Sequence, residues 1–145
     1  MNQVTEMTDR QLAYVVFRLS LGVNILIHGY GRLFGPGAGT FASKTMTEFA
    51  VTPLPRSLTY VFLVTLPLVE LMVGTLIGLF TRAALTVGGF LITALIFGTA
   101  LRSDWAAVGI QMIYSITYYL LLVNRSENRF SLYTLLLSKP AVPSR

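Results

Sequence analysis

Four long apolar segments constrain this chain more than any other feature of its sequence. They cover residues 11–34, 57–80, 83–101 and 106–123, and about 20 residues at 1.5 Å rise per residue span a hydrocarbon core of roughly 30 Å. Only 12% of the residues are charged, and the mean hydropathy is +0.67, so water could not solvate this surface without large apolar patches. The sequence therefore predicts an all-α integral membrane protein, an antiparallel four-helix bundle that forms one domain over residues 11–137.

The connection between the first two spans, residues 35–56, is the longest. It opens with Gly-Pro-Gly and closes near Pro53 and Pro55, so helix breakers mark both of its ends. Apolar residues at near-helical spacing predict a short interfacial helix at about residues 40–51, a lid over one end of the bundle. The remaining segments are a polar N-terminus, a second interfacial helix too short to cross the membrane, and a flexible tail, at residues 1–10, 130–137 and 138–145.

The distribution of positive charge predicts the orientation. An even number of spans places both termini on one side of the membrane. That side holds six basic residues and the other side four: Arg10, Arg82, Arg125, Arg129, Lys139 and Arg145 against Arg32, Lys44, Arg56 and Arg102. The positive-inside rule then favours a multi-pass protein of the cell inner (cytoplasmic) membrane with both termini in the cytoplasm.

Several kinds of chemistry are excluded by the residue types present. The chain has no cysteine, which excludes disulfides, thiolate nucleophiles, cysteine zinc sites and iron–sulfur clusters within this polypeptide. A single histidine without a nearby carboxylate cluster has no metal-ligand spacing. The basic residues are scattered along the chain and are not interleaved with stacking aromatics, so no nucleic-acid partner is expected. We therefore expect no metal and no intrinsic cofactor.

Polar side chains form a stripe along the first span. At 100° per residue, Arg18, Asn24, His28 and Arg32 fall within a sector of about 120°. A charge at bilayer depth costs at least about 2.5 kcal/mol, so each should face the bundle interior. Arg18 and Glu70 lie roughly 24 and 20 Å below the outer ends of their spans at 1.5 Å per residue. We expect them to form an intramembrane polar pair, which is either a structural ion pair or a proton or ligand site.

A second polar face lies on the fourth span, where Gln111, Tyr114, Ser115 and Tyr118 follow at spacings of three and four. Such a face either lines a cavity or joins helices through hydrogen bonds. His28 is either a hydrogen-bond partner for a quinone carbonyl or a neutral histidine satisfied within the protein. We expect a quinone-like or lipid ligand in the outer half of the bundle. The candidate binding residues are Asn24, His28, Arg32, Gln111, Tyr114 and Tyr118.

Short motifs follow one another in a characteristic order. They are Arg-Leu-x-Leu-Gly at residues 18–22, His-Gly-x-x-Arg at 28–32, Leu-Pro-Leu-Val-Glu-Leu-Met-Val-Gly at 66–74, Leu-Phe-Thr-Arg at 79–82 and Phe-Ser-Leu-Tyr at 130–133. In this order and spacing they resemble the DoxX family of four-helix membrane proteins. The family commonly has Lys where this chain has Arg32, which keeps the charge but is a poor proton shuttle.

The resemblance implies a bacterial or archaeal cytoplasmic-membrane protein related to the membrane subunit of thiosulfate:quinone oxidoreductase. We expect an accessory subunit of a quinone-linked oxidoreductase or respiratory-type complex, which binds a quinone or lipid within the bilayer while protein partners carry the redox cofactor. Two alternatives stay open. One is a purely structural subunit of a larger membrane assembly, and the other is a catalytic subunit of the thiosulfate:quinone oxidoreductase type.

Overall fold

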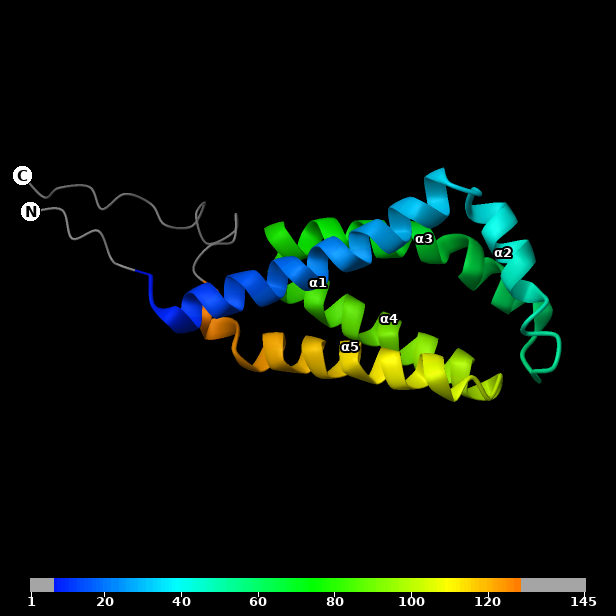
Figure 1. Ribbon diagram of the computed structural model, residues 1–145. Helices are drawn as coiled ribbons and strands as arrows, with labels where there is room; N and C mark the ends of the chain where they lie inside the picture. The colour runs from blue at the N-terminus through cyan, green and yellow to red at the C-terminus, as the bar shows by residue number, and fades with distance from the viewer. Residues whose placement is uncertain (1–6, 129–145) are drawn as a thin grey trace, which may run out of the picture.

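The chain folds into helices joined by short connections (Figure 1). A computed structural model describes residues 7–128, so the predicted second interfacial helix and tail lie outside the described residues. Four helices are long and apolar enough to cross a membrane: α1 (Asp9–Phe34), α3 (Arg56–Leu79), α4 (Thr81–Leu101) and α5 (Trp105–Val123). Their bounds agree to within two residues with the predicted spans. An all-helical fold with four helices of membrane-spanning length is thus confirmed over this part of the chain.

Two shorter helices complete the described structure. Helix α2 (Ala38–Met46) lies in the connection where the short helix was expected, and the 3₁₀ turn η1 (Arg125–Glu127) follows α5. Gly37 precedes α2 with φ of 86°, a left-handed conformation that glycine adopts without steric cost. Predicted and observed positions of α2 overlap, but the helix ends at Met46 and turns continue to Val51.

Local sequence explains where two of the spans begin. The Thr8 hydroxyl accepts a hydrogen bond from the Gln11 backbone N–H at 3.3 Å, and the Gln11 side chain accepts from the Thr8 N–H at 3.2 Å. This reciprocal capping box satisfies two backbone donors at the start of α1. The Asp104 carboxylate accepts from the Ala107 N–H at 3.1 Å and caps α5 in the same way.

The helices associate mainly in pairs. Helix α1 packs most extensively on α3, and α4 on α5, while α3 and α4 join the two pairs. Contact between α1 and α5 is limited, and in Figure 1 their ribbons diverge towards the end where α2 lies. The two helix pairs are therefore joined mainly through α3 and α4.

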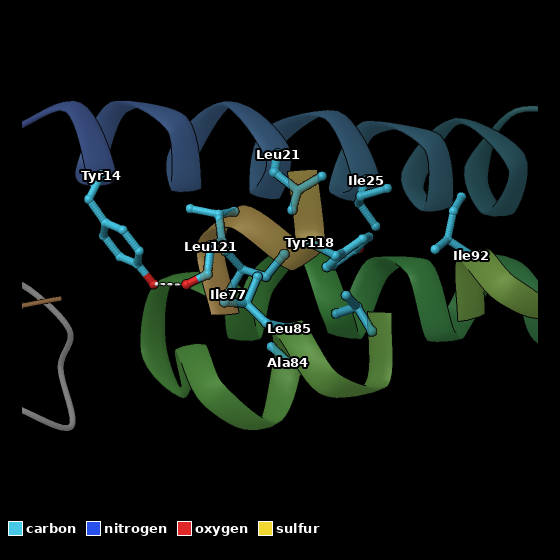
Figure 2. Packing of buried hydrophobic residues seen from close by; sticks show 10 residues of the cluster. Tyr14, Leu21, Ile25, Ile77, Ala84, Leu85, Ile92, Tyr118 and Leu121 are labelled. Carbon is cyan, nitrogen blue, oxygen red and sulfur yellow. Dashed lines mark hydrogen bonds between the residues drawn. The ribbon is translucent and has the colours of Figure 1, made fainter. Parts of the chain in front are cut away.

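The core lies where the two helix pairs meet (Figure 2). Buried side chains from all four long helices form it, and Ile77, Leu85 and Leu121 are almost completely enclosed. The Tyr14 hydroxyl donates a hydrogen bond to the Leu121 carbonyl oxygen at 3.2 Å. A separate cluster of Ala42, Leu63 and Leu66 fixes α2 against the first half of α3.

Glycines bring α1 and α3 into backbone contact. A Cβ atom added at Gly29 would meet the Leu71 nitrogen and the Pro67 carbonyl oxygen well inside 3.0 Å, and one added at Gly74 would meet the backbone of Leu26. Such contacts require glycine because the helix backbones cannot move aside. Gly78, one turn after Gly74, has no atom within 4 Å of its Cβ position, so the close contact does not extend to it.

Candidate functional site

The buried carboxylate of Glu70 pairs with Arg32. Its side chain is only 3% exposed, and Oε1 accepts a hydrogen bond from Arg32 Nη1. The guanidinium of Arg32 also lies over the ring of Phe41 in α2, 4.9 Å from its centroid. Arg32 therefore connects the middle of α3 to the helix that covers this end of the molecule.

This pairing corrects the expected pair of Arg18 with Glu70. Arg18 is buried and donates to Thr81 Oγ1 at 3.4 Å and to Asn128 Oδ1. It lies on the same helix as Arg32 but roughly 21 Å from it at 1.5 Å per residue. Glu70 is in direct contact with Arg32, which places Arg18 beyond its reach.

The position of α2 explains the error. The prediction measured depth from the ends of the two spans and so assumed that α1 and α3 pack along their whole lengths. Instead, α2 packs on the first half of α3 through Ala42, Leu63 and Leu66, and α1 contacts α3 further along, at Pro67, Leu71 and Gly74. The last turn of α1, with Arg32, therefore lies beside Glu70.

A cavity of about 480 Å³ lies beneath α2. Its walls come from α2 and the following turns, the first half of α3 and the second half of α4, with single contributions from α1 and α5. Most of the wall is apolar, including Phe41, Phe49, Phe62, Leu66 and Phe97. A volume of this size and a mainly apolar lining with a few polar groups are typical of small-molecule sites.

Several polar side chains also line the cavity. Arg102 donates to the Glu48 carboxylate, lies 3.6 Å from Asp104, and stacks over the ring of Phe49 at 4.9 Å. The Thr99 hydroxyl donates to Gln111 Oε1 at 2.6 Å. Among residues 7–128 no acceptor is found for the Gln111 amide nitrogen, so that donor is free to bind a ligand.

Both arginines of the cavity are neutralised by carboxylates. Arg32 is paired with Glu70, and Arg102 with Glu48. A charged ligand would have to compete with these ion pairs. The cavity therefore offers N–H donors and apolar surface without a net charge, an environment suited to a neutral molecule that carries carbonyl oxygens.

Three other predicted binding residues lie outside this cavity. The Tyr114 hydroxyl donates to Asn24 Oδ1 at 2.9 Å, which joins α5 to α1. His28 is exposed on α1, one turn beyond Asn24. Asn24, His28 and Tyr114 do not line the cavity beneath α2. Of the six predicted binding residues, only Arg32 and Gln111 line this cavity, although His28 lies one turn before Arg32 on α1.

Tyr118 lies in the core rather than in the cavity. It is 3% exposed, and its ring fills the space beside Gly88. Its hydroxyl and Glu70 Oε2 are buried, and within the described part of the chain neither has a hydrogen-bond partner. A buried polar group without a hydrogen-bond partner costs about 1–3 kcal/mol. Tyr118 thus places its hydroxyl in the protein interior, and it does not line the cavity.

Sequence reasoning missed the residues that close the cavity. Glu48, Phe49 and Arg102 were read as parts of the lid helix or as connection charges, because the sequence does not show that the first and third connections meet. The available signal was a negative charge in the first connection, Glu48 beside Phe49, and a positive charge in the third, Arg102.

No protein-family model matches this chain, and no similar protein is found among curated proteins or solved structures.

Proposed function

We propose that this chain is a DoxX-like membrane subunit that binds a quinone or a similar neutral lipid for a quinone-linked oxidoreductase. The observation that carries the proposal is the cavity beneath α2. Its walls are mainly apolar, and its charged hydrogen-bond donors, Arg32 and Arg102, are each paired with a carboxylate. A quinone ring has two carbonyl oxygens that accept hydrogen bonds and an apolar body and tail. Gln111 and Arg32 are suited to bind the carbonyls, and the phenylalanine and leucine walls to pack against the ring.

The proposed role is accessory. The chain has no cysteine, so a thiol relay to a quinone would reside on a partner. The groups at the cavity are donors and apolar walls, which bind and orient a ring. These residues therefore support a subunit that binds the quinone while a partner protein transfers the electrons.

The distribution of basic residues supports a particular arrangement in the membrane. In this arrangement the four long helices form an antiparallel bundle, α2 lies at the outer interface, and both termini are cytoplasmic. Arg32, Lys44, Arg56 and Arg102 would then lie on the outer side, where Arg32 and Arg102 line the cavity, and the larger set of basic residues would lie inside. A quinone dissolved in the bilayer could enter near the interface.

A structural subunit of a larger membrane assembly is the second candidate function. His28 is exposed on a helix long enough to span the membrane, and a polar side chain facing lipid at depth is unfavourable. A protein partner seated over this part of α1 would cover it. In that case the cavity would hold structural lipid or remain unused by a quinone.

Replacing Gln111 with leucine should weaken quinone binding by about 3- to 10-fold, the equivalent of one lost neutral hydrogen bond. The substitution should not harm folding, because the Thr99 hydroxyl, on losing Gln111 Oε1 as acceptor, can donate instead to the Leu95 carbonyl oxygen, 2.7 Å away. The measurement is equilibrium binding of decylubiquinone, a short-tailed quinone, to the purified chain in mild detergent.

His28→Ala is the matched control, since it removes a polar side chain that does not line the cavity. It should change quinone binding by less than about twofold. Loss of binding in His28→Ala with no loss in Gln111→Leu would place the ligand between α1 and α5 instead. Absence of quinone binding by the wild-type chain would favour the structural-subunit function.

A further inference from the structure

A second recess lies at the opposite end of α4 and α5. It has a volume of about 1030 Å³ and is formed by the turn between α3 and α4, the first turns of α4, and the end of α5 with η1. Its lining includes the basic residues Arg82 and Arg125, the hydroxyl residues Thr86 and Ser126, and the apolar residues Val87 and Val123. The recess is therefore lined by both polar and apolar side chains.

Within residues 7–128, no carboxylate pairs with the two arginines of this recess. No aspartate or glutamate is found among the described residues that line it. Arg82 and Arg125 are both exposed, and within residues 7–128 neither forms an ion pair. In the cavity beneath α2, by contrast, each arginine is paired with a carboxylate. The recess is therefore better suited to an anionic group than the cavity beneath α2.

The apolar part of the recess is also exposed. Val87 is 50% exposed and Val123 is 60% exposed, each on a helix of membrane-spanning length. Acyl chains would cover these valines in a bilayer. Guanidinium groups next to such a surface lie where a phospholipid phosphate would be, and arginine binds phosphate oxygens through paired N–H donors.

We propose that this recess binds the headgroup of an anionic phospholipid, with Arg82 and Arg125 on the phosphate and Val87 and Val123 against the first carbons of the acyl chains. Basic pockets between membrane helices on the cytoplasmic side commonly take such headgroups. A zwitterionic lipid fits less well, because its own cation offsets the phosphate that the two arginines attract. The proposal does not depend on the ligand of the cavity beneath α2.

The test compares lipid binding by the wild-type chain and by Arg82→Gln/Arg125→Gln. Native mass spectrometry in mild detergent measures retention of phosphatidylglycerol against phosphatidylcholine. We expect the wild-type chain to retain phosphatidylglycerol preferentially, and the double variant to bind it about 10- to 30-fold more weakly, since each arginine near the membrane surface contributes about one factor of five. Arg82→Lys/Arg125→Lys keeps the charges and should keep most of the preference.

Arg10→Gln/Arg56→Gln is the matched control, because it removes the same charge from positions outside the recess. It should leave the lipid preference within about twofold of wild type. Equal losses in the two glutamine variants would show a general effect of net charge and overturn the site. So would a wild-type chain without preference for phosphatidylglycerol, or one that binds inorganic phosphate and no lipid.

Discussion

Replacing Arg32 with methionine is expected to lower the free energy of unfolding by about 3 kcal/mol. Glu70 is 3% exposed, and breaking a buried ion pair from one side costs about 3–5 kcal/mol because the remaining charge is uncompensated. The lower end applies because Arg32 itself is 32% exposed. Glu70→Gln should cost less, about 1 kcal/mol, since the arginine that remains reaches solvent and still stacks on Phe41. Chemical unfolding in mixed micelles, followed by circular dichroism, measures both variants.

A double-mutant cycle separates the observed pair from the expected one. Arg32→Met and Glu70→Gln share a contact, so their effects should deviate from additivity by more than about 1 kcal/mol. Arg18→Met and Glu70→Gln should be additive to within about 0.5 kcal/mol, because Arg18 contacts Thr81 and Asn128. A larger coupling energy for Arg18 than for Arg32 would contradict the register of α1 on α3.

Replacing Gly74 with alanine should also destabilise the protein strongly, by about 1–3 kcal/mol or more. The added methyl group would meet the backbone nitrogen and Cα of Leu26, so the whole of α1 must move away from α3. This movement would disturb the contact at Gly29 as well, where Leu71 and Pro67 approach. The thermal midpoint of the purified chain measures the loss.

Gly78→Ala is the control on the same helix. No atom lies within 4 Å of its Cβ position, and alanine favours a helix over glycine by about 1 kcal/mol. It should therefore leave the protein as stable as wild type or slightly more stable. A drop for Gly78→Ala equal to that for Gly74→Ala would mean that loss of glycine itself, and not the contact with Leu26, is responsible.

Local sequence patterns were sufficient to predict the helices. Hydropathy defines the spans because each must present apolar side chains over its whole length, and the Gly-Pro-Gly before Ala38 marks the start of α2. The stripe of Arg18 and Arg32 on one side of α1 was also visible, since helical periodicity follows from spacing alone. Both arginines do contact other helices.

The arrangement of the helices relative to one another could not be predicted in the same way. Which arginine meets Glu70 depends on how far α1 slides along α3, and that is set by Ala42 of α2 packing on Leu63 and Leu66. A single sequence does not record such contacts between distant segments. For the same reason His28 was assigned to the interior, although it is exposed.

The most direct test of the central claim is photolabelling of the full chain in liposomes with an azido-quinone. The account predicts crosslinks in peptides that carry Phe41, Phe62 and Phe97, the aromatic walls of the cavity beneath α2, and loss of these crosslinks when unlabelled quinone is added in excess. Crosslinks confined to residues 16–28 of α1, or labelling that excess quinone does not reduce, would contradict it.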